Sequence, residues 1–310
     1  MFDIVRYTPD RQEEWDAFVE RSKNGTFLMK RGYMDYHADR FTDASLLFYL
    51  KGKLYALLPA NINGSVLHSH QGLTYGGLLM DEHCCAADVL RLFGEMNDWL
   101  RNEGVKQVIY KPIPHIYSTA PAEEDLYALF RCGATLTARG LSTTIDLTRS
   151  SRWRQNRRTA LNKATAAGIT VTTSQNLEPF WHILEENLMQ THGIRPVHTL
   201  AEMQLLQSRF PKNIQLYTAH TPQGDTIAGI LLYLTPQVIH SQYISATAEG
   251  KAKGAIDALM HRILQTQGHY FDFGISTEHG GQYLNESLIF QKEGFGGRGT
   301  CYDIYEYTLS

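Results

Sequence analysis

Apolar residues in the second half of the chain switch between the spacing of strands and the spacing of helices. Residues 213–219, 227–234 and 238–246 are rich in β-branched and aromatic residues, and they predict three consecutive strands with a Pro-Gln-Gly-Asp turn after the first. Residues 252–267 carry apolar side chains at i, i+3, i+4, i+7 and i+8, which predicts a helix that Gly268 ends. The remaining predicted elements of this half are a strand at 270–274, a helix at 282–291 and a closing strand at 301–309.

The first half of the chain repeats this order of elements. An apolar stripe predicts a helix over residues 86–102, which Gly104 ends. In both halves, strands lead into a long helix, a glycine, a strand, a second helix, a glycine and a strand. We interpret the repetition as an internal duplication that divides the chain into domains 1–150 and 151–310. The other predicted elements are strands at 46–50, 54–59, 66–69, 108–110 and 141–147, and helices at 13–22, 33–41, 126–132, 177–190 and 200–208.

Length and composition are consistent with two packed domains. The chain has 310 residues, of which 43% are hydrophobic and 20% charged, and this is long for one core but sufficient for two. The net charge of −3 argues against DNA as a partner. The N-terminus lacks an apolar segment, and no apolar run approaches the roughly 20 residues that cross a bilayer. We therefore expect a cytoplasmic protein without integral membrane association.

The cysteines and histidines of the chain predict neither disulfides nor a metal site. No Cys-x-x-Cys pair occurs, and the 13 histidines lack the spacing of metal ligands. His68 and His70 share a strand face, but no third ligand lies at a useful spacing. The four cysteines are Cys84, Cys85, Cys132 and Cys301.

Three stretches of the second half resemble the GNAT superfamily of acyltransferases, and within it the FemAB-like proteins. The sequence FDFG at 271–274 resembles the strand that follows the long helix of the family, and KEGFG at 292–296 resembles its K-x-x-F-G segment. Residues 157–168 resemble the basic helix that opens the second domain of such proteins. The resemblance implies an α/β fold of two tandem GNAT-like domains, each with a mixed, mostly antiparallel sheet flanked by helices.

The resemblance implies a bacterial N-acyltransferase. The enzyme would move an acetyl or other acyl group, or an aminoacyl group, from a thioester or tRNA donor to an amine. The acceptor would be a small molecule or a precursor of the cell wall or of a polysaccharide. No segment between Gly168 and Asn213 is long enough for the helical arm of the longer peptidyltransferases, which favours acetyl-CoA or another acyl-CoA over aminoacyl-tRNA. A GNAT-like module that binds a ligand or partner without catalysis is the alternative.

The resemblance also assigns catalytic candidates. Acyl transfer passes through an oxyanion, which a fixed cation stabilises, and by resemblance the K-x-x-F-G lysine, Lys292, faces the donor and can do this. A solvated lysine beside a helix end is the alternative. Asp272, Glu278 and His279 are candidates for taking the proton of the attacking amine. Asp272 lies between two aromatic residues on a strand and points opposite to both, so it faces either a groove or a structural hydrogen-bond network. Gln291 stands where the family has an aromatic residue before the lysine.

The start of the long helix is the expected cofactor site, because free N–H groups and the helix dipole favour phosphate there. The family pattern has a further glycine or alanine where this chain has Ile256, so a polar loop that caps the helix is the alternative. The candidate cofactor-binding residues are Lys251, Lys253, Gly254, Ala255 and Phe295.

Clusters of cations and aromatic residues elsewhere are candidates for binding the substrate, since arginine suits phosphate recognition. For the cluster near the N-terminus and for the basic segment that bridges the two predicted domains, which we call the bridging cluster, the alternative is a solvated helix face. Around Gly76 the alternative is a bulged strand with a tight turn. The bridging cluster could also contact tRNA. The candidates are Lys30, Arg31, Tyr33, Tyr36 and His37 near the N-terminus, Tyr75 and Gly76 before the first long helix, and Arg157 and Arg158 in the basic segment.

Overall fold

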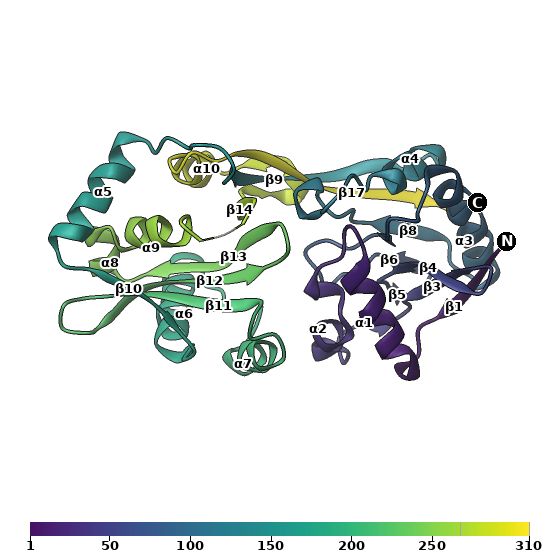
Figure 1. Cartoon of the computed structure of the whole chain (residues 1–310), viewed down its shortest axis with the longest axis horizontal. Coiled ribbons are helices and arrows are strands. Elements are labelled where there is room, and N and C mark those ends of the chain that lie inside the picture. The colour runs from purple at the N-terminus through teal and green to yellow at the C-terminus, as the bar shows by residue number, and fades with distance from the viewer. Residues whose placement is uncertain (267, 310) are drawn as a thin grey trace. The chain divides into compact units, whose positions relative to one another are not determined.

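The computed structural model of the protein describes residues 1–266 and 268–309, which form two compact units (Figure 1). Unit 1 contains Met1–Leu141, Thr277–Tyr283 and the segment from Cys301 onward, whereas unit 2 contains Ser142–Ser276 and Leu284–Thr300. The two units are therefore interleaved along the chain, which differs from the predicted division into 1–150 and 151–310. The difference arises because the last strand of the chain pairs in unit 1.

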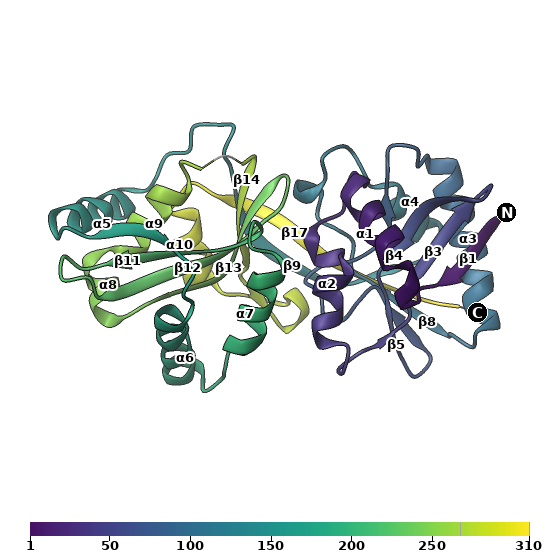
Figure 2. The same ribbon diagram turned by 60° about the horizontal axis from the view of Figure 1, so that its bottom comes forward.

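Unit 1 contains a small antiparallel sheet with a helix packed on each face (Figure 2). In the order of the sheet, its strands are β1 (Phe2–Arg6), β3 (Leu46–Leu50), β4 (Lys53–Leu58) and β7 (Leu79–Met80). The apolar stripe of α3 (Ala86–Asn102) packs on the face that carries Phe48 and Leu58. Helix α1 (Gln12–Arg21) contacts β4 and buries Trp15 and Phe18. The alternation of side chains along each strand thus places apolar residues against both helices.

A second sheet of unit 1 includes the closing strand of the chain. Strand β17 (Arg298–Thr308) pairs antiparallel with β8 (Gln107–Tyr110), so that Tyr305 lies opposite Tyr110. The other strands of this sheet are the first part of β9 (Thr135–Asp146), β6 (Val66–His68), β5 (Asn61–Asn63) and β2 (Thr42–Asp43).

The remaining elements of this part of the chain are short. Two are the helices α2 (Arg31–Met34) and α4 (Glu124–Arg131), and two are the paired strands β15 (Thr277–Glu278) and β16 (Tyr283–Leu284). The 3-10 turns are η1 (Pro9–Arg11), η2 (Phe27–Met29), η3 (Asp35–His37), η4 (His115–Tyr117) and η5 (His279–Gly281).

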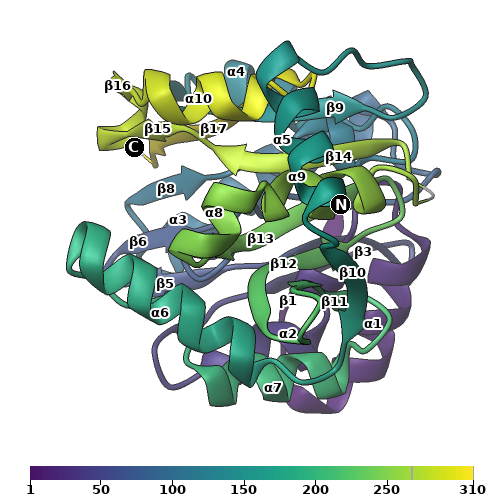
Figure 3. The same ribbon diagram turned by 90° about the vertical axis from the view of Figure 1, so that its left-hand side faces the viewer.

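Unit 2 is a sheet between two layers of helices (Figure 3). The strands, in the order of the sheet, are β10 (Thr170–Ser174), β11 (Ile214–His220), β12 (Thr226–Leu234), β13 (Val238–Ala246), β14 (Tyr270–Ile275) and the second part of β9. Helix α9 (Ala255–Ile263), which contacts α5 (Gln155–Ala166), packs on β11, β12 and β13. Helix α6 (Glu178–His192) packs on β12 and β13 and α7 (Leu200–Arg209) on β11, on the other side. Neighbouring strands are antiparallel except β13 and β14, which run parallel.

The predicted elements with the clearest periodicity have the predicted bounds. The helix over 86–102 and the strands over 46–50 and 238–246 are confirmed. The single helix over 252–267 is wrong, because α8 (Ala248–Lys253) and α9 are separate helices; its last residue, 267, lies outside the described residues. The helix predicted over 282–291 begins later, as α10 (Glu286–Glu293), since Asn285 caps it.

Gly254 separates α8 from α9 because another helix approaches its backbone. Its φ of 75° lies in the left-handed region, and a Cβ at this position would lie 2.3 Å from the carbonyl oxygen of Ala160 in α5. Glycine therefore permits both the break between the helices and the crossing of α5. Tight packing thus accounts for this glycine without a ligand.

We predict that Gly254→Ala lowers the free energy of unfolding by about 2–5 kcal/mol, from the left-handed backbone and the overpacking together. Gly224→Ala is the matched control, because Gly224 has a φ of 93° but no atom of the described residues within 4 Å of the place that a Cβ would occupy. The control should lose only about 1–2 kcal/mol. Equal losses in chemical denaturation would show that contact with α5 does not matter.

Candidate active site

A cavity of about 650 Å³ opens in unit 2 where β13 and β14 stop pairing. The parallel ladder joins Val238–His240 of β13 to Tyr270–Asp272 of β14 and goes no further. Ser241 and Phe273, the next residues along each strand, line the cavity. The other walls come from the starts of α8 and α9 and from α10, together with Arg157 of α5 and Phe295.

Irregular backbone on both strands accompanies their separation. In β14, Gly274 has a φ of 76°, and the register with β9 shifts between Asp272 and Ile275. In β13, a bulge leaves Gln242 outside the ladder with β12, because Ser241 and Tyr243 pair with consecutive residues of β12. The carbonyl groups of Gly274 and Ile275 are thereby available to side chains.

Lys292 uses these carbonyl groups to fix its ammonium group at the cavity. Its Nζ donates to the carbonyl oxygens of Gly274 at 2.8 Å and Ile275 at 3.0 Å. An ammonium group has three donors, and the hydrogen bonds to Gly274 and Ile275 use two of them among the described residues, which leaves the third for a ligand. Burial lowers the pKa of Lys292 to about 8, although Asp272 acts in the opposite direction. Lys292 is therefore mainly charged at neutral pH and can stabilise an oxyanion.

Two further polar groups at the cavity lack partners among the residues that the structure describes. The hydroxyl of Ser241 and the Nε of Arg157 are buried and make no hydrogen bond there. Ser241 is 6% exposed, and a buried hydroxyl without a partner costs about 1–3 kcal/mol. The other guanidinium nitrogens of Arg157 bond Asp257 and the carbonyl of Gln291. Ser241 thus lines the cavity, and its buried hydroxyl has no hydrogen-bond partner among the described residues.

Asp272 lies in a hydrogen-bond network and does not line the cavity. The hydroxyls of Ser142 (2.5 Å) and Thr144 (2.9 Å) donate to one oxygen, and His240 Nδ1 (2.8 Å) and the Gly274 N–H (3.2 Å) to the other. Burial would raise the pKa of Asp272, but these hydrogen bonds outweigh it and lower the pKa. The carboxylate is therefore ionised and held in place. This arrangement corresponds to the structural alternative for Asp272 and does not put it in a groove.

At the start of the long helix, three of the backbone N–H groups expected near the pyrophosphate of CoA make hydrogen bonds within the chain. The N–H groups of Gly250 and Lys251 are bonded to Thr247, and that of Gly254 to Lys251. The buried carboxylate of Asp257 lies in the first turn of α9, where it pairs with the guanidinium group of Arg157 at 3.4 Å. These internal hydrogen bonds favour the alternative of a polar loop that caps the helix.

The other candidate cofactor residues are divided between the cavity and its surroundings. Lys251 lines the cavity and donates to Asn187 at 3.1 Å, and Phe295 stacks on Phe273 there. Lys253 instead pairs with Glu249 along α8 and is not part of the lining. Ala255 is fully buried in the core below α9. Of this group, the structure brings Lys251, Gly254 and Phe295 together with Lys292.

Glu278 and His279 belong to unit 1, whereas Lys292 belongs to unit 2. Both side chains are exposed, and His279 has a φ of 52° beside the glycine turn that follows. The cavity of unit 2 does not include either residue. In the basic helix, Arg157 lines that cavity, whereas Arg158 is exposed and bonds Gln155.

The N-terminal candidates form a packed cluster in unit 1. Arg31 is 3% exposed, pairs with Asp35 and Asp43, and stacks on Tyr7 with 3.8 Å between its guanidinium carbon and the ring centroid. These contacts give Arg31 a structural role that differs from the expected phosphate binding. Lys30 pairs with the exposed Glu20. The aromatic candidates of this region are buried or stacked on one another, namely Tyr33, Tyr36, His37 and Tyr75.

Gly76 is required by packing. A Cβ at Gly76 would lie 2.0 Å from the carbonyl oxygen of Ser69, so the close approach is made by the chain and not by a ligand. The bulged turn that the sequence left open as an alternative accounts for this glycine.

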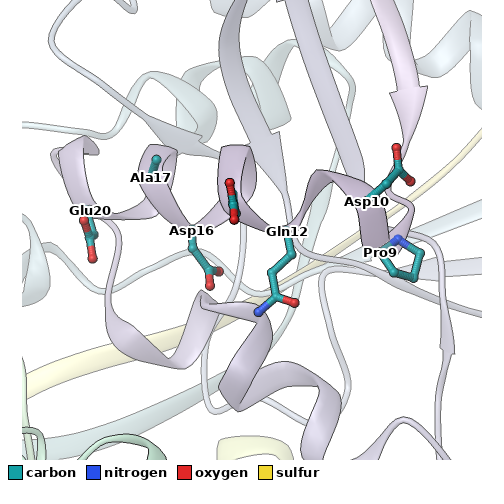
Figure 4. Close-up of a pocket in the computed structure, with 7 residues that line it drawn as sticks. Pro9, Asp10, Gln12, Asp16, Ala17 and Glu20 are labelled. Carbon is teal, nitrogen blue, oxygen red and sulfur yellow. The ribbon is translucent and has the colours of Figure 1, made fainter.

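A hollow of about 600 Å³ along α1 in unit 1 has an acidic lining (Figure 4). Its carboxylates would disfavour an anionic donor, and it contains no residue that the sequence predicted to bind a ligand. The acidic lining residues are Asp10, Glu13, Asp16 and Glu20.

Part of the chain matches a known family. Residues 151–283 match the family described as acetyltransferase (GNAT) domain. The cavity lies largely within the matched segment, and α10 with Lys292 follows it. No curated protein sequence matches the chain significantly.

Solved structures share the fold of the whole chain. FemX is 10% identical over 99% of this chain and 97% of its own, with a TM-score of 0.71. L-PGS from Bacillus licheniformis is 16% identical over 97% and 92% (TM-score 0.62), and a tandem GNAT protein from the clavulanic acid biosynthesis pathway is 10% identical over 100% and 99% (TM-score 0.52). The predicted fold of two tandem GNAT-like domains, similar to FemAB-like proteins, is confirmed.

The described residues contain no helix long and apolar enough to cross a membrane. Within the same residues, no group of three or more His, Cys, Asp or Glu side chains is arranged to hold a metal ion.

Sequence reasoning did not single out Ser241, His240 or Asp257. The alternation along 238–246 could have shown that Ser241 shares the core-facing side of the strand with Ile239. A serine on an apolar strand face is a detectable signal. His240 gains its interest only from Asp272 on β14, a strand distant in sequence.

We predict that acetyl-CoA and S-acetylpantetheine bind with dissociation constants that differ by less than about tenfold, or about 1.4 kcal/mol. The reason is that the N–H groups of Gly250, Lys251 and Gly254 make hydrogen bonds within the chain and are not available to the pyrophosphate, which only CoA carries. Isothermal titration calorimetry measures both constants. Binding of acetyl-CoA that is 100-fold tighter, and that Lys251→Ala weakens, would show that the pyrophosphate does bind there.

Proposed function

We propose that the protein is an N-acyltransferase that accepts an acyl or aminoacyl group in the cavity of its GNAT domain. The observation that carries this proposal is the fixed ammonium group of Lys292 at the cavity where β13 and β14 separate, a cavity that Ser241 with its unpartnered hydroxyl also lines. Both groups suit a carbonyl that becomes an oxyanion. The acceptor is an amine of a cell-wall or polysaccharide precursor.

The chemical step follows from these groups. The lone pair of the amine forms a C–N bond to the donor carbonyl carbon, and the carbonyl oxygen gains negative charge next to Lys292. The C–O bond of an ester donor, or the C–S bond of a thioester, then breaks and the carbonyl re-forms. The leaving oxygen or sulfur takes up one proton, and the amine loses one. Lys292 stabilises the charge that exists only during this step.

The internal hydrogen bonds at the start of the long helix favour an aminoacyl ester of tRNA over CoA as donor. Only the acyl end of an aminoacyl-tRNA ester has to enter the cavity. The basic helix α5 supplies Arg157 to the lining of the cavity, and the same helix carries the exposed Arg158. Phosphate contacts from such a helix would be sensitive to salt. The fold shared with FemX and L-PGS is consistent with this choice.

A binding module without catalysis is the second candidate, and the same internal hydrogen bonds favour it. One experiment distinguishes the two candidate functions. The full chain is incubated with a labelled donor, which is alanyl-tRNA, seryl-tRNA or acetyl-CoA, and with an acceptor, which is a nucleotide-linked amino sugar or a lysine-containing cell-wall peptide. Mass spectrometry detects any new amide. Amide formation supports the enzyme, whereas binding of an acceptor without amide formation from any donor supports the module.

We predict that Lys292→Met lowers the transfer rate by about 10²–10³-fold, the usual cost of removing one oxyanion donor. Lys253→Met is the matched control, since Lys253 is ion-paired outside the cavity. Because the ammonium form is active and the pKa of Lys292 is about 8, the wild-type rate should fall as the pH rises through about 8. A full rate in Lys292→Met would remove this role.

We predict that Ser241→Ala keeps or raises the free energy of unfolding, because it removes a buried hydroxyl that has no described partner. The variant should also lose about tenfold in kcat/KM for the donor, the equivalent of one hydrogen bond. Ser245→Ala is the control, since it loses the hydrogen bond with Asn187 and should be less stable by about 1 kcal/mol. Unchanged kcat/KM in Ser241→Ala would show that the hydroxyl does not contact the donor.

A further inference from the structure

His240 and Asp272 form the last rung of the parallel ladder between β13 and β14. Their neighbours Ile239 and Phe271 belong to the hydrophobic core on the α9 side of the sheet. Since side chains alternate along a strand, His240 and Asp272 point to the opposite face. The pair therefore lies at the point of separation, on the face of the sheet that α9 does not cover.

Asp272 fixes the tautomer of His240. The carboxylate is fully buried and ionised, and it accepts a hydrogen bond from His240 Nδ1 at 2.8 Å. The hydroxyls of Ser142 and Thr144 hold the other carboxylate oxygen. With its proton on Nδ1, a neutral imidazole carries a lone pair on Nε2, which is the form that accepts a proton.

Gly274 joins this pair to the lysine at the cavity. Its N–H donates to Asp272 and its carbonyl oxygen accepts from Lys292. The Asp272 carboxylate and the Lys292 ammonium group are therefore both hydrogen-bonded to this one residue. A Cβ placed on Gly274 would lie 3.5 Å from Cε1 of His240, which shows how near the imidazole is. The side chain of His240 is 13% exposed, whereas that of Asp272 is 0% exposed. Of the two, only the imidazole has surface through which a substrate could be met.

We propose that His240 is the catalytic base that takes the proton of the attacking amine, and that Asp272 is the positioning residue that orients it. This inference rests on the proposed acyl transfer. The acyl carbonyl would lie at the separation of the strands, with the donor in the cavity on one face and the amine arriving from the face of His240. A carbonyl carbon between two faces can be attacked from the side opposite the donor's body.

The number of protons is the same before and after the reaction. The N–H bond of the neutral amine breaks, its proton passes to Nε2 of His240, and the nitrogen forms the C–N bond. When the tetrahedral intermediate collapses, the bond to the leaving oxygen or sulfur breaks, and the imidazolium returns the proton to that atom. His240 ends the cycle neutral, and no further reactant is needed.

Chemical rescue tests this role directly. The variants His240→Ala, Asp272→Asn and Lys292→Met are assayed with the alanyl-tRNA, seryl-tRNA or acetyl-CoA reaction that the wild type supports, with and without added imidazole. We expect His240→Ala to lose about 10²–10⁴-fold in rate, the usual contribution of a general base, and to regain at least tenfold with imidazole. Lys292→Met should not respond to imidazole. Asp272→Asn should lose rate because its amide no longer fixes the tautomer.

The outcomes separate the base from the proposed function. If the wild type forms no amide with any of these donors, the acyl transfer is wrong and the assignment of His240 falls with it. If the wild type is active and His240→Ala either keeps its rate or loses it without any response to imidazole, only the base assignment is overturned. His240→Gln, which preserves the hydrogen bond to Asp272, guards against a misfolded alanine variant. If His240→Gln melts at the same temperature as the wild type but has lost the transfer rate, the result supports His240 as the base. A full transfer rate in His240→Gln overturns this assignment.

Discussion

Strands β13 and β14 stop pairing after His240 and Asp272, and the candidate site depends on this separation. Two parallel strands that continued together would bond their own carbonyl groups. Here the carbonyls of Gly274 and Ile275 instead receive the ammonium group of Lys292. The separation thereby creates a cavity and places a charged group in it with two of its three hydrogen bonds already made. Such preorganisation is what stabilises a developing charge most effectively.

The polar groups around this point differ in how far the chain satisfies them. Asp272 is fully buried, and fixed donors bond both of its oxygens. The hydroxyl of Ser241, one residue beyond the ladder, has no partner among the described residues. A buried polar group without a partner reduces stability, and we infer that a ligand in the cavity completes the hydrogen bonding of Ser241. The contrast distinguishes the satisfied network around Asp272 from the unsatisfied hydroxyl of Ser241.

Periodicity predicted the parts of the fold that local sequence determines. The helix over 86–102 and the strand over 238–246 have strong and uninterrupted patterns, and their bounds are correct. The break at Gly254 was missed because a glycine is tolerated in a helix, and only the crossing of α5 at Ala160 makes the break visible. Lys292 was found through a short motif. His240 was missed because its partner is on a strand that the sequence does not show to be adjacent.

Charge clusters were the least reliable guide to the site. Arg31 is of a residue type that often binds phosphate, yet Asp35 and Asp43 neutralise its charge within the core of unit 1. Near Lys253, where a phosphate site was expected, the N–H groups of Gly250, Lys251 and Gly254 likewise bond within the chain. Sequence identifies which residues are charged, but only packing determines which of them keep a free donor for a ligand.

A structure of the protein with a stable amide analogue of the aminoacylated 3′ end of tRNA would test the central claim most directly. The account predicts that the carbonyl oxygen of the analogue lies within about 3.2 Å of Nζ of Lys292, in the cavity between β13 and β14. An analogue bound elsewhere, with the cavity unchanged and Lys292 contacting only Gly274 and Ile275, would contradict it.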